Sequence, residues 1–139
     1  MRILGLDYGS LTVGVAVTDA LGMTAQGLTI LRRDQENKLR KTLREIEEIV
    51  REYDVTTIAV GLPLNIDGTE GERCEKARAF AAMVESRTHV PVVMVDERLT
   101  SVEAEELMGE AGLSKAEKKK RVDQVAAVLI LEDYLHGLQ

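Results

Sequence analysis

Three short apolar segments near the N-terminus have the pattern of β-strands: Arg2–Tyr8, Leu11–Thr18 and Gly27–Arg33. The second of them, L-T-V-G-V-A-V-T, alternates its side chains as a half-buried strand does. Gly9-Ser10 and the other turn-rich stretches between the segments favour hairpin connections. This part of the chain therefore predicts three antiparallel strands.

Downstream of these strands the apolar positions follow a helical period. Along Glu36–Tyr53 and Glu72–Arg87 apolar residues lie on one side, with charged residues between them. This spacing predicts two helices, each with an apolar face toward a core. The expected core-facing residues are Leu39, Leu43, Ile46, Val50 and Tyr53 in the first helix, and Ala77, Phe80, Ala81 and Val84 in the second.

Short apolar runs at Thr57–Gly61 and Val92–Val95 predict two buried strands. Two more helices are expected, one from about Thr100 or Ser101 to Gly112 and one over Arg121–Leu135. Strands that alternate with helices imply parallel pairing through right-handed crossovers. The chain therefore predicts an α/β fold.

The composition fits one compact domain over residues 1–139. Hydrophobic residues make up 45% of the chain and charged residues 30%, a balance that argues against disorder. Cys74 is the single cysteine, so no internal disulfide can form, and a reducing compartment, the cytoplasm, is expected. No apolar run approaches ~18 residues, which argues against a membrane span.

Charge limits the class of partner. The chain has 24 acidic and 18 basic residues and a net charge of -6, which disfavours broad binding to a polyanion. A local basic cluster nevertheless lies near the C-terminus, where Lys115, Lys118, Lys119, Lys120 and Arg121 fall within seven residues.

Acidic residues stand where strands end. Asp7 closes the first strand, and Asp96 and Glu97 close the last one. If these strands are parallel neighbours, the acids emerge at one edge of the sheet, where functional residues of α/β proteins gather. Asp19 ends an antiparallel strand and is expected at the opposite edge. Asp123 opens the final helix on the apolar stripe that holds Ala126, Ala127, Ile130 and Tyr134.

The negative charges of clustered carboxylates repel one another and must be neutralised. Two of them ~4 Å apart repel by about 4 kcal/mol at an effective dielectric constant of ~20. Protons or hard cations, Mg²⁺ or Mn²⁺, could neutralise such a cluster, and two such ions can promote phosphodiester cleavage. Strand-end acids also occur as helix caps or as solvated side chains, so the residues alone leave both interpretations open.

Several motifs together resemble the YqgF family, bacterial proteins similar to RuvC-type Holliday-junction resolvases and also named as pre-16S rRNA nucleases. The motifs are G-L-D-Y-G-S (5–10), G-V-A-V-T-D (14–19), V-G-L-P-L-N-I-D-G-T (60–69), D-E-R-L-T (96–100) and K-K-K-R-V-D-Q-V-A-A (118–127). The resemblance covers essentially the whole chain. It implies an RNase H-like fold, with a five-stranded mixed sheet and helices on both faces.

The resemblance also implies a catalytic, metal-binding triad of Asp7, Glu97 and Asp123, which would hold Mg²⁺ or Mn²⁺, with two ions expected. Asp96 would lie beside the site, and alternation along a strand agrees that only one of the neighbours Asp96 and Glu97 can point into it. The implied reaction is hydrolysis of RNA phosphodiesters in the maturation of the 5′ end of 16S rRNA. Resolution of DNA junctions is the alternative.

Basic residues near these acids are candidates for binding the nucleic-acid backbone. They are Arg98, Lys118, Lys119, Lys120 and Arg121. Such contacts position a strand without reading its sequence. A salt bridge for Arg98 and a solvated helix start for the lysines are the alternative interpretations. The expected nucleic-acid partner is pre-rRNA rather than a DNA junction, and ribosomal components are expected as further partners. The protein is expected to be a monomer or a homodimer.

Two other functions remain open from the sequence. The D-x-G segment with its hairpin, Asp7–Gly9, resembles the first phosphate loop of actin-like ATPases, but 139 residues cannot supply their two large domains. A noncatalytic nucleic-acid-binding module is the other alternative. It would bind RNA without cutting it.

Overall fold

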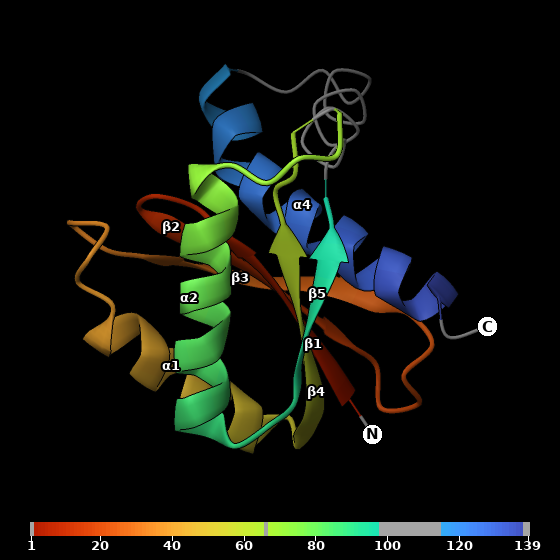
Figure 1. Cartoon of the computed structure of the whole chain (residues 1–139). Helices are drawn as coiled ribbons and strands as arrows, with labels where there is room; N and C mark the ends of the chain where they lie inside the picture. The colour runs from red at the N-terminus through yellow and green to blue at the C-terminus, as the bar shows by residue number, and fades with distance from the viewer. Residues whose placement is uncertain (1, 66, 98–114, 138–139) are drawn as a thin grey trace.

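A computed structural model describes residues 2–65, 67–97 and 115–137, and over residues 115–124 it describes the backbone alone. Its centre is a five-stranded sheet with the order β3-β2-β1-β4-β5 (Figure 1). The strands are β1 (Arg2–Tyr8), β2 (Thr12–Thr18), β3 (Ala25–Arg32), β4 (Val55–Leu62) and β5 (Val92–Asp96). The helices are α1 (Arg40–Glu52), α2 (Glu72–Thr88) and α4 (Lys115–Gly137).

The pairing of the strands confirms the expected α/β class. β1 pairs antiparallel with β2, and β2 pairs antiparallel with β3. β1 pairs parallel with β4, and β4 pairs parallel with β5. The carboxyl ends of β1, β4 and β5 therefore meet at one edge of the sheet, which is called the carboxyl edge below.

The assumption that the first and last strands are neighbours is wrong, because β4 lies between β1 and β5. The chain leaves β3 at one side of the sheet, passes through α1 and returns next to β1. Only the following crossover, through α2, reaches the outer position of β5. The backbone of an acid on β1 and the backbone of an acid after β5 are therefore separated by the width of a whole strand.

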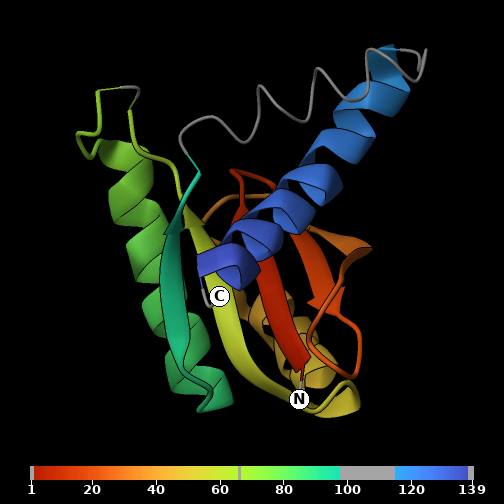
Figure 2. The same ribbon diagram turned by 90° about the vertical axis from the view of Figure 1, so that its right-hand side faces the viewer.

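Helices cover both faces of the sheet, as expected. α1 and α2 lie side by side on one face, and α4 crosses the other face (Figure 1, Figure 2). The N-terminal turns of α4 point toward the carboxyl edge. In the described ranges, no helix combines the length and the apolar character that crossing a bilayer requires.

Two layers of apolar side chains hold the helices to the sheet. On the α1–α2 side the core includes Leu43, Ile46, Phe80 and Val84, all buried as their helical spacing predicts. On the α4 side the core includes Ile3, Ala16, Ala127 and Leu131. The second layer is thin because α4 approaches the sheet closely: a Cβ at Gly5 would lie 2.9 Å from the Ala127 carbonyl oxygen.

Two helices begin elsewhere than the sequence predicts. α1 begins at Arg40 rather than Glu36, because Glu36 is drawn into contacts with α2. α4 begins at Lys115 rather than Arg121, since its lysines, alanine and glutamate are good helix formers. The helix expected over 100–112 lies outside the described residues.

Candidate active site

Asp7 lies near the carboxyl end of β1, beside a position that has no side chain. It is half-buried, and its cross-strand partner on β2 is Gly14. Cross-strand partners share one face of the sheet, so no side chain of β2 stands directly opposite Asp7. Glycine there leaves space next to the carboxylate.

Glu97 reaches the same place from β5. It directly follows that strand, and its backbone N–H donates to the Leu62 carbonyl of β4 at 3.1 Å. A Cβ at Gly61 of β4 would lie only 2.5 Å from Glu97 Cδ and 2.6 Å from Glu97 Oε2. Because glycine occupies position 61, the Glu97 side chain can lie across β4 and meet Asp7.

The Asp7 and Glu97 carboxyls share a hydrogen bond. Burial, and after it the charge and hydrogen bond of Asp7 and the charge of Asp96, raise the pKa of Glu97 to about 9. At neutral pH, Glu97 therefore keeps its proton and donates it to the Asp7 carboxylate. One proton holds together two groups that would otherwise repel each other.

A cavity of about 460 Å³ opens beside this pair at the carboxyl edge. It is wide enough for a small ligand or for one unit of a polymer. The cavity is lined by Asp7, Tyr8, Gly9, Ser10, Pro63, Leu64, Arg73 and Glu97. The β1–β2 turn, the segment after β4 and the first turn of α2 thus form its walls.

The two other strand-end acids lie elsewhere. Asp96 is exposed, while its neighbour Glu97 lines the cavity, as strand alternation requires. Asp19 lies in the β2–β3 hairpin, where its Oδ1 accepts from the backbone N–H groups of Met23 at 2.8 Å and Thr24 at 3.4 Å. These bonds lower the pKa of Asp19, and its role is to cap the turn.

The third acid, Asp123, belongs to α4, one helical turn before Ala127. Ala127 packs over Gly5 of β1, and the turns that precede it point toward the carboxyl edge (Figure 2). The backbone thus places Asp123 on the part of α4 nearest the carboxyl edge. Its side chain lies outside the described residues.

The candidate nucleic-acid-binding residues are outside the described part of the chain as well. Arg98 lies in the range 98–114, and the structure gives only the backbone of Lys118, Lys119, Lys120 and Arg121, inside α4. Within the described residues, no group of three His, Cys, Asp or Glu side chains is arranged to hold a metal ion. Asp7 and Glu97 are a pair, and the expected third member is Asp123, of which only the backbone is described.

Two residues of this site were not identified from the sequence. Gly61 ends a predicted strand, but its role depends on β4 lying between β1 and β5, which the sequence pattern does not specify. Arg73 stands in the first turn of α2 and lines the cavity. A basic residue that follows a polar loop after a buried strand is the signal that could have pointed to Arg73.

Comparisons with known proteins identify the family of the chain. The chain matches the family RuvX, described as Holliday junction resolvase, over residues 1–137. A protein of Agathobacter rectalis named "Putative pre-16S rRNA nuclease" is 53% identical over 99% of this chain and 96% of its own length. A protein of Clostridium acetobutylicum with the same name is 46% identical over 99% of this chain and 100% of its own length.

Solved structures share the fold. RuvC of T. thermophilus in complex with a Holliday junction superposes with a TM-score of 0.58 at 20% identity, over 99% of this chain and 96% of that one. The Holliday junction resolvase of fowlpox virus superposes with a TM-score of 0.56 at 13% identity, over 100% of both chains. Both confirm the expected RNase H-like, mixed-sheet fold.

Proposed function

Because the chain belongs to the RuvX family of Holliday junction resolvases, we propose that it is a metal-dependent nuclease with Asp7 and Glu97 at its centre. One observation carries the proposal: these two carboxyls, from β1 and from the end of β5, meet over Gly61 beside an open cavity. Such a costly arrangement of acids is expected where a cation takes the place of the shared proton.

The donor atoms suit a hard divalent cation. Asp7 and Glu97 offer only carboxylate oxygens, which Mg²⁺ and Mn²⁺ prefer over the nitrogen and sulfur ligands of zinc. Asp123 is the proposed third ligand, since α4 carries it one turn before the contact with Gly5. When bound at such a site, divalent ions activate a water and stabilise the leaving oxygen of a phosphodiester.

Each protein group has a separate task in this proposal. Asp7 accepts the hydrogen bond of the protonated Glu97 carboxyl in the metal-free protein. Glu97 would lose its proton to solvent on binding of a cation, so that both carboxylates could serve as ligands. Gly61 leaves the space over β4 in which the pair meets, and Ile130 of α4 packs beside it.

Precursor 16S rRNA is the proposed substrate. Relatives that share 53% and 46% of the sequence carry that activity in their name, and they match this chain over nearly its full length. A four-way DNA junction is the second candidate, because the family is described as a Holliday junction resolvase. The phosphate backbone is proposed to be held by the basic side chains Arg98, Lys118, Lys119, Lys120 and Arg121. A cytoplasmic location belongs to the same proposal, because the proposed substrate is an rRNA.

The test is cleavage of a precursor 16S rRNA fragment with Mn²⁺ by the wild type and by Asp7→Asn. The wild type should cut the RNA, and Asp7→Asn should not, since the amide removes one charge from the ion site. Asp96→Asn is the matched control, because Asp96 is exposed and outside the cavity lining. Full cleavage by Asp7→Asn would reject the assignment, and a parallel assay with a four-way DNA junction decides between the two substrates.

A further inference from the structure

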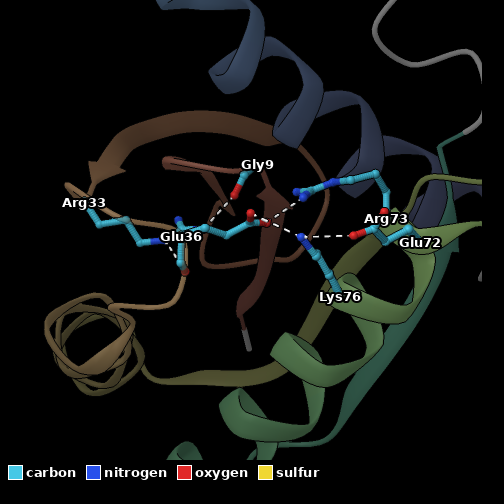
Figure 3. Close-up of polar contacts among 6 residues, drawn as sticks. All are labelled: Gly9, Arg33, Glu36, Glu72, Arg73 and Lys76. Carbon is cyan, nitrogen blue, oxygen red and sulfur yellow. Dashed lines mark hydrogen bonds and ion pairs between the residues drawn. The ribbon is translucent and has the colours of Figure 1, made fainter.

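Three cationic side chains, Arg33, Arg73 and Lys76, gather around Glu36 (Figure 3). Figure 3 shows the Glu36 carboxylate between Arg73 and Lys76. Arg73 Nη1 donates to Glu36 Oε1 at 2.5 Å, and Lys76 Nζ donates to Glu36 Oε2 at 3.3 Å. Arg33 completes the group, with its guanidinium 4.8 Å from the centre of the Tyr8 ring.

Arg33 and Lys76 make their contacts outside the cavity that holds Asp7 and Glu97. Arg33 donates to the Gly9 carbonyl at 2.7 Å and to the Glu36 carbonyl at 3.1 Å, so it ties the β1–β2 turn to the segment before α1. Lys76 lines a neighbouring cavity of about 350 Å³ and also pairs with Glu72 at 3.5 Å. Neither residue lines the cavity that holds Asp7 and Glu97.

Arg73 does line that cavity, and it is the one cationic side chain among the described residues that do. Its side chain is 39% exposed, so a ligand can reach it. The Glu36 carboxylate holds one of its nitrogens, and the Tyr8 ring lies 5.5 Å below its guanidinium carbon. The guanidinium is thus held at the cavity wall while part of its surface faces solvent.

A purely structural role explains this placement poorly. Half-exposed ion pairs contribute little to stability, and Glu36 has a second cationic partner in Lys76. The hydrogen bond from Arg73 also lowers the pKa of Glu36, which keeps that carboxylate ionised at neutral pH. Glu36 therefore serves as a permanent anchor that orients Arg73.

The charge of the cavity favours a cation at this position. A phosphodiester strand that approaches the acidic pair of Asp7 and Glu97 is repelled by the negative charge that the pair carries. A guanidinium has five N–H donors in a rigid fork that fits phosphate oxygens, and its bond to Glu36 uses one of its terminal nitrogens. We propose that Arg73 binds a backbone phosphate of the nucleic-acid strand in this cavity, held in position by Glu36 and Tyr8.

The proposal rests on the proposed function in one respect, namely that the strand enters the cavity of Asp7 and Glu97. Binding is therefore measured without cleavage: a fluorescein-labelled precursor 16S rRNA fragment is titrated in EDTA at several salt concentrations, with fluorescence anisotropy as the readout. The variants are Arg73→Gln, Arg73→Lys and the control Arg78→Gln. Arg78 lies on the same helix and pairs with Glu70 at 2.8 and 3.0 Å, but it does not line the cavity.

Arg73→Gln should weaken binding about tenfold and reduce the slope of log Kd against log salt by about one. Arg73→Lys should keep the slope, because it keeps the charge, and should bind severalfold more weakly than the wild type, because it loses the fork. Arg78→Gln should change neither quantity. If a circular dichroism melt shows that Arg73→Gln is not folded, the proposal is tested by comparing the affinity of Arg73→Lys with that of the wild type.

Equal affinity and equal slope of Arg73→Gln and Arg78→Gln would overturn this inference. If Arg73→Gln is unfolded, an Arg73→Lys variant that binds the fragment as tightly as the wild type would overturn the inference. Failure of the proposed function has a different signature, because the wild type would then bind the fragment in EDTA but never cut it with Mn²⁺. The two proposals can therefore fail separately.

Discussion

At position 61 the missing side chain lets Glu97 lie across β4. A methyl group there would stand 2.5 Å from both Glu97 Cδ and Ile130 Cδ1. Gly61→Ala must therefore displace the carboxylate, the α4 side chain or both. We expect a loss of about 1–3 kcal/mol in the free energy of unfolding, measured in urea, together with loss of Mn²⁺-dependent RNA cleavage.

Gly137→Ala is the matched control for this change. A Cβ at Gly137 would have no heavy atom within 4 Å, so stability and cleavage should stay at the wild-type values. Wild-type cleavage by Gly61→Ala would mean that Glu97 does not need the space over β4, and the described geometry would then be irrelevant to activity.

Glu97 makes the stability of the metal-free protein depend on pH. Its pKa is about 9 in the folded protein against an ordinary value of 4.5, so between these values folding takes up a proton. Stability in EDTA should therefore fall as pH rises from about 4.5 to about 9. Glu97→Gln keeps a hydrogen-bond donor for Asp7 without the proton uptake, and it should be more stable than the wild type by up to roughly 3 kcal/mol at pH 7.

Urea unfolding between about pH 5 and about pH 9 measures both effects of Glu97. The difference between Glu97→Gln and the wild type should widen as pH rises through this range. A constant difference, or a wild type that gains stability toward high pH, would show that Glu97 is ionised in the folded protein.

Among the elements, α4 forms one layer of the core and packs beside Gly61, the glycine over which Asp7 and Glu97 meet. Leu131 is fully buried, and its Cδ2 lies 3.6 Å from the place where a Cβ at Gly5 would stand. Leu131→Ala should lower the free energy of unfolding by about 2–5 kcal/mol, because the removed side-chain atoms leave a cavity between α4 and β1. Leu21→Ala makes the same chemical change at a side chain that is 78% exposed, and it should cost less than about 0.5 kcal/mol.

Urea unfolding of both leucine variants checks this comparison. Equal losses at positions 131 and 21 would contradict the packing of α4 on the sheet. A selective loss for Leu131→Ala would confirm that α4, and with it the backbone at Asp123, is fixed by its contact with β1.

The types of the described elements could be predicted from their apolar periods, because each period reflects burial along one segment. The strand order could not. The placement of β4 between β1 and β5 follows from how two crossovers pack on the sheet, and no local pattern at Thr57–Gly61 records it. The start of α1 was missed for a similar reason, since Glu36 fits a helix but is held by Arg73 and Lys76 of α2.

The site was predictable to the same extent. Asp7 and Glu97 could be identified because strand-end acids and family motifs coincide there. Their meeting over Gly61 depends on the strand order, and the position of Arg73 depends on the distant Glu36. These features are contacts between segments far apart in the chain, so a reading along the sequence does not reveal them.

On the scale of the whole molecule, charge must act locally. With a net charge of -6 the protein as a whole repels a polyanion, so a strand has to be drawn in by particular groups. Arg73 on α2 and the basic run of α4 come from helices on opposite faces of the sheet, on either side of the carboxyl edge (Figure 2). This arrangement would allow an acidic protein to bind nucleic acid at one edge, as proposed above.

The most direct test of the site is calorimetric titration of the metal-free protein with Mn²⁺ at pH 7, in buffers with different ionisation enthalpies. Because Glu97 keeps its proton to about pH 9, binding to the wild type should release about one proton. Glu97→Gln should bind more weakly and release none, and Asp96→Asn should behave as the wild type. Mn²⁺ binding without proton release, or binding that Glu97→Gln leaves unchanged, would contradict a metal site shared by Asp7 and Glu97.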